Sequence, residues 1–411
     1  MAEETIMSVI PVIKSLWNLY LKKHKKDLVN AWKIPISKRY EIVKNYYHDI
    51  SESMFSFEMK EGGTKVMPFL VLPNWYKIDN VNTDRFKETH ESISLKSEQK
   101  GFWNFYGDEI QKPGWKDRDD DVFRLVSFEV NDQSLELSLQ LCKFSEAFVC
   151  QYILEHELVI TQMSHPGIKK AFKRPFALRD KVACDLDSIL SFFKRHYARI
   201  GINNLFLLRK DNEYYRPMIF QRGEMSMTRL PLFDAASSCI FSVQTNARED
   251  KKLLHTVTRE IAEELFGYKE VEQRSNYTNP NRHYNMDGIS DLMDLLDTKD
   301  AEFHVTGFGI DLIRLVPEIT TLLVVRDSKY YQIHDDPPSG RAPFRLNREL
   351  LPASDFEIPT GLKDADGFLK EEIIRNPNEG ELNKGFDPEL WTLPASFSFV
   401  QGIRRATTVG I

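Results

Sequence analysis

Three glutamates recur at a helical spacing in TVTREIAEELFG, residues 256–267. Glu260, Glu263 and Glu264 stand at i, i+3 and i+4, so a helix would gather their carboxylates on one face. Like charges at that spacing repel by roughly a few tenths of a kcal/mol per pair, unless a cation lies between them. Carboxylate oxygens are suitable ligands for Mg²⁺ and Mn²⁺, and phosphates can complete the shell. The spacing therefore predicts a metal site that grips a phosphate-bearing ligand or, since Glu is a good helix former, a solvated helix face.

An amphipathic helix predicted over residues 249–266 would carry these carboxylates. Leu254, Val257, Thr258, Ile261 and Leu265 recur at helical spacing and form an apolar stripe beside the glutamates. We therefore expect the stripe to pack on a core and the glutamates to lie at its margin. His255, on the same helix, is interpreted as a polar residue of the helix face and not as a metal ligand.

Apolar segments on both sides of this helix are typical of strands. They are residues 202–210, 216–222, 234–243, 302–315 and 319–327. The predicted order is thus three strands, the glutamate helix and two further strands. Such an order favours a sheet on which the helix packs.

The order of elements and the helix motif together resemble the Nudix family. The box of that family reads G, five residues, E, seven residues and then R-E-U-x-E-E-x-G-U, where U is aliphatic. Arg259, Glu260, Ile261, Glu263 and Glu264 match the R-E-U-x-E-E part. The resemblance implies that the three glutamates ligate Mg²⁺ or Mn²⁺ and that Arg259 orients the site by ion pairing.

One more residue acquires an expected role from the resemblance. Arg222 ends the second predicted strand, where Nudix proteins often contact their substrate. The alternative interpretation of Arg222, an exposed cation at a strand end, is equally open.

Other positions depart from the Nudix box. Gly267 comes one residue late, and Phe266 stands where the box has glycine. Lys251 occupies the position of the upstream glutamate, and Thr245 that of the leading glycine. Glu249 is close to the upstream position but out of register. The metal-binding half of the box is thus present, whereas the upstream loop is not.

A narrower resemblance, to uncharacterised bacterial Nudix-like proteins, covers roughly residues 120–330. The shared stretches are Leu178-Arg179-Asp180, residues 198–203, the segment from Arg259 to Gly267 and residues 307–315. This resemblance favours a bacterial origin but adds no activity, because the function of that group is largely unassigned.

Two functions follow from the Nudix resemblance. The first is a metal-dependent pyrophosphohydrolase acting on a nucleoside diphosphate derivative, with Arg259 and the three glutamates as its catalytic residues. By sequence position, Glu249, Glu302 and Asp311 are candidates for the general base. The second is a catalytically inactive Nudix-like sensor that binds a nucleotide, or a regulatory or scaffold protein, because a fold alone does not fix function.

The expected fold class is α+β, with a Nudix-like α/β/α sandwich around a mixed sheet and an additional α/β region before it. The division comprises a helical segment at 1–60, an α/β region at 61–195, the Nudix-like domain at 196–345 and a C-terminal extension packing on the core at 346–411. Within the second part, residues 61–120 read as irregular and 122–141 as a hairpin that turns at Asn131-Asp132-Gln133. Helices are predicted over 5–50, 144–157 and 185–197.

Composition limits the partners of the chain. Its 411 residues carry a net charge of −6, and 42% of them are hydrophobic. Mixed charges argue against nucleic-acid binding, and no apolar run reaches the length of about 18 residues that a membrane helix needs. The four cysteines match no zinc or redox spacing, which predicts reduced thiols in the cytoplasm. We expect a nucleotide-type small molecule as ligand, with a homodimer or a protein partner as further options.

Overall fold

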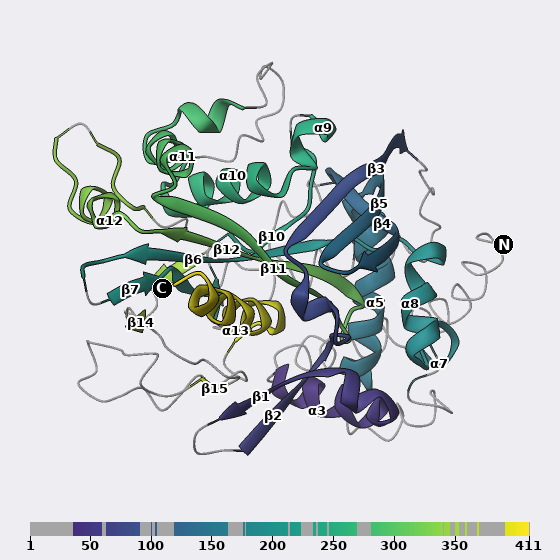
Figure 1. Cartoon of the computed structure of the whole chain (residues 1–411). Helices are drawn as coiled ribbons and strands as arrows, with labels where there is room; N and C mark the ends of the chain where they lie inside the picture. Colours follow the sequence, from purple (N-terminus) through teal and green to yellow (C-terminus); the bar gives the residue numbers. More distant parts are fainter. Residues whose placement is uncertain are drawn as a thin grey trace.

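The chain forms an α+β structure with a mixed central sheet, as the sequence predicts (Figure 1). The computed structural model describes residues 36–59, 63–90, 100, 103–104, 119–162, 176, 178–212, 214–222, 233–235, 237–244, 246–268, 281–339, 341–345, 350–352, 358–359, 368–369 and 391–410. The predicted helix over 5–50 is therefore described only from residue 36, where α3 (Ile36–Tyr46) begins. In the described part of the chain, no helix is long and apolar enough to cross a membrane.

In the described part of the chain the main sheet has nine strands, and its centre is built from three long ones. β6 (Gly201–Arg209) pairs in parallel with β12 (Val316–Val325), and β12 pairs antiparallel with β11 (Ala301–Asp311). The path is β14 (Ile358–Pro359), β7 (Tyr214–Pro217), β6, β12, β11, β2 (Gly63–Leu70), β1 (Met54–Met59) and β15 (Phe368–Leu369), and β10 (Cys239–Ile240) also pairs with β6. The predicted strand over 302–315 thus ends at Asp311, because the chain turns before β12.

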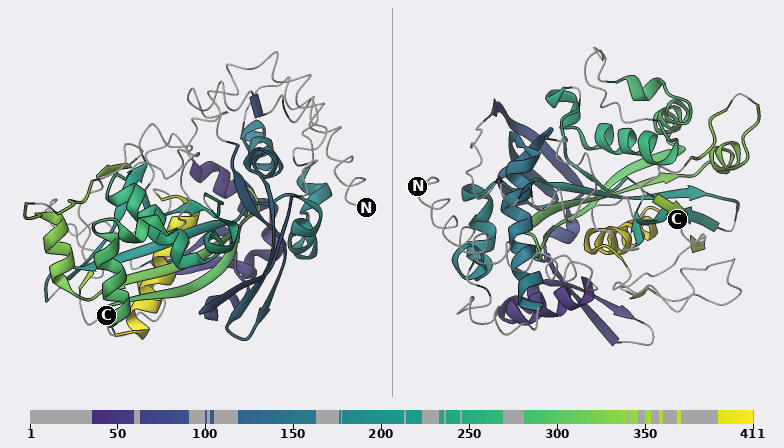
Figure 2. Two further views of the ribbon diagram at one scale, coloured as in Figure 1. Left: turned by 90° about the horizontal axis from the view of Figure 1, so that it is seen from above. Right: turned by 180° about the vertical axis from the view of Figure 1, so that it is seen from behind.

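Helices cover both faces of this sheet, which explains why β12 is buried along its whole length. α13 (Leu393–Thr408) packs on β6, β11 and β12 from one side. α10 (Leu253–Leu265) and α11 (Ile289–Thr298) lie on the other side (Figures 1 and 2). A Cβ built on Gly402 of α13 would come within 2.5 Å of the Leu205 side chain on β6, so glycine lets this helix approach the sheet closely.

A second sheet has the order β3, β5, β4. β4 (Asp121–Asn131) and β5 (Ser134–Lys143) form the predicted hairpin, and Asp132 takes a left-handed φ of 52° in its turn. β3 (Asn80–His90) pairs in parallel with β5. The prediction that 61–120 is irregular is therefore wrong for β2 and β3. β2 pairs with the adjacent β1 and with the distant β11, and β3 pairs with the distant β5.

Two predicted strands are interrupted. Residues 216–222 divide at Met218 into β7, which joins β6, and β8 (Ile219–Arg222), which joins a three-stranded sheet with β9 (Phe233–Ala235) and β13 (Leu350–Pro352). The chain changes sheets there while the Met218 N–H donates to the Phe206 carbonyl at 2.9 Å. Residues 234–243 likewise divide into β9 and β10, with Ser237 at a φ of 61° between them.

Helices beside the second sheet agree with the sequence pattern. α5 (Phe144–Gln162) extends the predicted helix over 144–157 by five residues. α8 (Leu186–Arg195) begins at a capping box formed by Asp185 and Ser188. The remaining helices with described bounds are η2 (His48–Ser53), η3 (Trp75–Lys77), α7 (Arg179–Val182), α9 (Ala247–Asp250), η6 (Arg282–Asn285) and α12 (Ser328–Asp335).

Arg179 connects α7, α5 and the turn between β11 and β12. Its guanidinium is fully buried and donates to the carbonyls of Leu312 at 2.7 Å and Leu154 at 3.3 Å, and also to that of Ile313. The arginine of the Leu178-Arg179-Asp180 stretch therefore fixes α7 and α5 to the turn between β11 and β12.

Strands from all four predicted parts of the chain meet in the main sheet. β1 ends the part predicted as helical, β2 belongs to the next, β6, β11 and β12 to the third, and β14 and β15 to the last. The boundaries at residues 60, 195 and 345 stay predictions.

Candidate functional site

The glutamates lie on α10, which is preceded by the short helix α9. The single helix predicted over 249–266 is interrupted at Lys251 and Lys252, where Lys252 has an extended backbone. The interruption turns the Asp250 carboxylate back toward the preceding loop, and its Oδ2 accepts the N–H groups of Gln244 at 2.9 Å and Asn246 at 3.0 Å. The Thr256 hydroxyl also donates to the Asp250 carbonyl at 2.9 Å, which holds the two helices together.

The apolar stripe of α10 faces the core, as predicted. Val257, Ile261 and Leu265 have no exposed surface, whereas Leu254 is partly exposed. Removing three such side chains from water stabilises the helix by several kcal/mol, since each contributes about 1.5–3 kcal/mol. The position of the glutamates is therefore fixed by packing, with Glu263 at the edge of the buried surface.

Arg259 lies between two of the glutamates. Its Nη2 is 2.8 Å from Glu260 Oε1, and its Nη1 donates to Glu263 Oε1 at 3.2 Å. Burial alone would lower the pKa of Arg259, but the carboxylates of Glu260 and Glu263 raise it above its ordinary value. The pair of acids therefore holds a buried guanidinium in its charged form.

Glu264 has a different structural partner. Its Oε2 accepts the backbone N–H of Ser237 at 2.5 Å, in the left-handed link between β9 and β10. The bond fixes the end of α10 to the strand that pairs with β6. Glu264 is consequently engaged in positioning the link.

Cys239 was not anticipated as a neighbour of the glutamates. Burial raises the pKa of its thiol well above the ordinary range, and the negative charges of Glu260, Glu264 and Glu263 raise it further, against the opposing charge of Arg259. The thiol is therefore protonated and unreactive at neutral pH. All four cysteines are free thiols, as the sequence predicts.

The side chains do not fit a resident metal as they are arranged. Glu260 and Glu263 share Arg259, and Glu264 accepts a backbone N–H. Among the described residues, no three His, Cys, Asp or Glu side chains form a group that could hold a metal ion. Ligation of Mg²⁺ or Mn²⁺ by the three glutamates stays a prediction.

The structure does not bring the three candidate general bases together. Glu249 pairs with Lys252 at 2.7 Å, and Glu302 pairs with Arg326 and His304. Asp311 lies at the far end of β11 from Glu302, about 30 Å away at the rise of a strand. At most one of these two carboxylates can serve any single site.

The other residue expected at the site, Arg222, is the last residue of β8 and stands opposite Leu350 of β13. Its strand therefore belongs to the three-stranded sheet and not to the main sheet. The side chain of Arg222 lies outside the described part of the structure.

A buried polar cluster surrounds the start of α10, and the residue pattern does not predict it. His255 is 1% exposed, so the prediction that it lies on the polar helix face is wrong. Its Nδ1 is 3.3 Å from Asp250 Oδ1, and its ring meets that of His283 edge to face at 4.6 Å. His283 Nε2 is in turn 3.2 Å from the Thr258 hydroxyl. The break after α9 creates this cluster, because it places Asp250 beside the next helix.

Comparison with known proteins assigns no family. No protein-family model matches the sequence, and no curated protein matches it.

Proposed function

We propose that this chain is a Nudix-like binding protein with a regulatory or scaffold role, which takes a nucleotide-type ligand without hydrolysing it. The observation that carries the proposal is Lys251, which stands where the Nudix box has its upstream glutamate and lies 3.3 Å from Asp84 Oδ1. In this reading the three glutamates stabilise the fold around α10. The pyrophosphohydrolase reading, in which they ligate Mg²⁺ or Mn²⁺, is the alternative that the test below must exclude.

The energetics of a buried arginine support a structural role for the acids. The side chain of Arg259 is 3% exposed, and an uncompensated buried charge costs several kcal/mol. Glu260 and Glu263 supply that compensation, and their charges are in turn balanced in part by the guanidinium. The stacking of acids on this helix thus has a reason within the protein itself.

The departure at Lys251 supports the same reading. Lys251 stands where the Nudix box has its upstream glutamate, and here its Nζ lies 3.3 Å from Asp84 Oδ1 and 3.4 Å from the Thr83 carbonyl. The Lys251 carbonyl also accepts the Thr83 hydroxyl at 3.3 Å. This position therefore joins the start of α10 to β3, a structural use in place of a fourth acid.

The decisive experiment is a phosphate-release screen over nucleoside diphosphate derivatives, with Mg²⁺, with Mn²⁺ and with a chelator. Wild type is compared with Glu263→Gln and with Glu41→Gln, which removes an exposed glutamate from another helix. We expect no metal-dependent release from any of the three proteins.

A calorimetric titration of Mn²⁺ into the same proteins gives a second readout. Equal isotherms are expected, because the paired glutamates offer no joint ligand set. Phosphate release or Mn²⁺ binding that is lost in Glu263→Gln and retained in Glu41→Gln would overturn the proposal and establish the hydrolase reading.

A further inference from the structure

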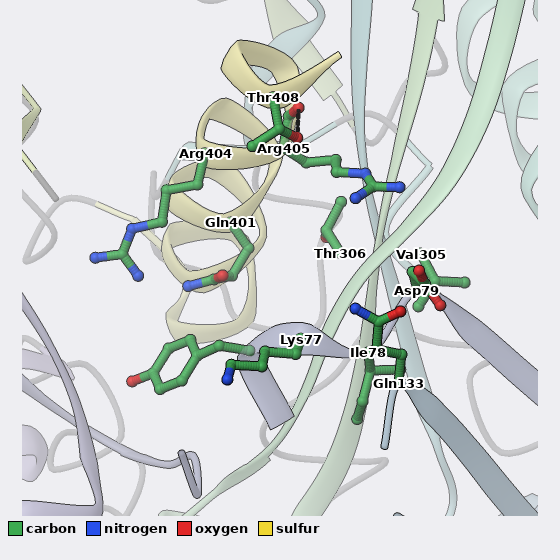
Figure 3. A pocket seen from close by; sticks show the side chains of 11 residues that line it. Lys77, Ile78, Asp79, Gln133, Val305, Thr306, Gln401, Arg404, Arg405 and Thr408 are labelled. Carbon is green, nitrogen blue, oxygen red and sulfur yellow. Dashed lines mark hydrogen bonds between the residues drawn. The ribbon is translucent and has the colours of Figure 1, made fainter. Parts of the chain in front are cut away.

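A pocket of about 240 Å³ lies beside the C-terminal part of α13 (Figure 3). Its walls come from α13, from β11, from η3 and the chain that follows it, and from Gln133 in the turn between β4 and β5. The volume equals about eight water molecules at the roughly 30 Å³ that each occupies in the liquid. The pocket can therefore hold a small molecule of more than one functional group.

Hydrogen-bond donors and positive charges dominate the lining. Lys77, Arg404 and Arg405 contribute three cations, and Asp79 is the one acid among the described residues that line the pocket. Within the described part of the chain, none of the three cations forms an ion pair with a carboxylate. Arg404 instead places its guanidinium 5.9 Å from the ring centre of Tyr76. The pocket thus has a surplus of positive charge that its own acids do not neutralise.

Gln401 adds a buried donor to these charges. It is 3% exposed, it lines the pocket, and its Nε2 has no hydrogen-bond partner among the described residues. The buried Nε of Arg405 also lacks one. Leaving a buried donor unsatisfied is costly, so both groups favour a ligand that supplies acceptor oxygens.

The position of these residues at the end of α13 explains the arginines but not Gln401. Cations in the last turn of a helix are favoured by its dipole, which is reason enough for an arginine at position 404 or 405. The dipole gives no reason for the unpaired amide of Gln401, one turn earlier. Gln401, Arg404, Arg405 and Thr408 follow the i, i+3, i+4, i+7 spacing, so a single face of α13 lines the pocket.

The directions of the two arginines favour a ligand with more than one anionic group. Figure 3 shows their guanidinium groups extending to different sides of Gln401, with Arg405 toward Thr306. A ligand that contacts both must therefore present anionic groups on both sides of Gln401. A diphosphate carries two linked anionic groups and supplies acceptor oxygens to arginine and amide donors alike.

We propose that this pocket binds the diphosphate group of a small molecule, with Arg404 and Arg405 contacting its phosphates and Gln401 donating a hydrogen bond. The pocket is on the face of the main sheet opposite α10 (Figure 1). The proposal goes beyond the function proposed above, because it holds whether or not the glutamate helix binds a metal. Mn²⁺ titration and phosphate release report on α10, whereas diphosphate binding reports on α13.

Calorimetry with inorganic pyrophosphate, inorganic phosphate and a nucleoside diphosphate, at low salt and without divalent ions, tests the site. We expect wild type to bind pyrophosphate more tightly than phosphate and to bind it less tightly as salt increases. Arg404→Gln/Arg405→Gln should lower the affinity for pyrophosphate at least tenfold. Arg195→Gln, which removes a last-turn arginine from α8, is the matched control and should bind like wild type.

Gln401→Met keeps the size of the side chain and removes the amide. It should weaken pyrophosphate binding severalfold while leaving the melting temperature unchanged or raised, because an unsatisfied buried donor is removed. This variant tests the site even if the double arginine variant does not fold.

Equal affinity for pyrophosphate and the nucleoside diphosphate would show that the site contacts the diphosphate alone. Tighter binding of the nucleotide would place its base in the same pocket. The proposal is refuted if wild type binds no pyrophosphate at millimolar concentration, or if folded double arginine and Gln401→Met variants both bind it as wild type does.

Discussion

The carboxylate of Glu318 on β12 occupies the space next to Gly201, its partner in the register with β6. A Cβ built on Gly201 would lie 1.8 Å from Glu318 Oε2. The same oxygen accepts a hydrogen bond from Asn203 Nδ2 at 2.6 Å, and the whole residue is 6% exposed. Glycine at position 201 is therefore a condition for burying this glutamate in the centre of the sheet.

The first prediction concerns this pair. Gly201→Ala should lower the free energy of unfolding by about 1–3 kcal/mol, because the carboxylate must move away from Asn203. In a double-mutant cycle, adding Glu318→Ala should recover part of that loss. Urea unfolding of the two single variants and the double variant measures the coupling, and strictly additive losses would contradict the contact.

The second prediction is a pH dependence. Burial raises the pKa of Glu318 to about 8, with Arg199 opposing and Asp311 adding to the shift. The unfolded chain releases this proton near the ordinary pKa of 4.5, whereas the folded chain retains it to about 8. The contribution of Glu318 to stability is thus fully present below about pH 4.5 and is lost as the pH rises through about 8.

Glu318→Gln should remove the loss of stability that Glu318 causes as the pH rises. The difference in unfolding free energy between Glu318→Gln and wild type should grow in favour of the variant from pH 5 to about pH 8, the value to which the pKa is raised. Urea unfolding at several pH values measures it. The comparison is made as a difference because Glu157, whose pKa burial raises to about 7, titrates in both proteins.

The third prediction uses the free energy of unfolding alone to distinguish the possible roles of the glutamates on α10. Glu263→Gln removes a charge from the buried pair with Arg259, and Gln retains only the weaker hydrogen bond. We expect a loss of about 1–3 kcal/mol in unfolding free energy without any metal present. A solvated helix face predicts a change within about 0.5 kcal/mol, and relief of acid repulsion predicts a gain. Chemical denaturation beside the Glu41→Gln control distinguishes the three results.

The fourth prediction concerns the arginine that joins α7, α5 and the turn after β11. Arg179→Lys retains a charge but loses the planar fork that donates to the Leu312 and Ile313 carbonyls. The loss should reach about 3 kcal/mol or more, since the site is fully buried. Arg195→Lys, an exposed position, should change stability by less than about 0.5 kcal/mol in the same urea series.

Local signals in the sequence were sufficient where the structure is local. The hairpin over 122–141 alternates on both sides of a polar turn, and α8 begins at Asp185, a good capping residue. β3 lacks such a signal, because most of its residues are polar and its partner β5 starts 54 positions further on, where Asn80 pairs with Ser134. Because β3 pairs in parallel with a distant strand, its own sequence has no apolar alternation that would indicate a strand.

The residues of the candidate site could be predicted from the sequence, whereas most of their contacts could not. The Nudix resemblance implied ion pairing by Arg259, and its pair with Glu263 joins i and i+4 positions, which meet on any helix. The pairing of Asp250 with His255 depends on the break at Lys251 and Lys252, which the periodicity of 249–266 conceals. The pocket beside α13 combines Gln133, β11 and Gln401, and so required the folded chain.

The arrangement of β6 sets the order in which the nascent chain can assemble. The side chain of Asn203 donates to Glu318, which follows 115 residues later in the chain. The carbonyl of Asn203 accepts the hydroxyl of Ser398, which follows 195 residues later. At about 5–20 residues per second of synthesis, β6 lacks β12 for roughly 6–23 s and α13 for longer still. Eight consecutive buried residues of β6 remain without their final cover during that interval. We expect this strand to be a site at which a chaperone engages the chain on the ribosome.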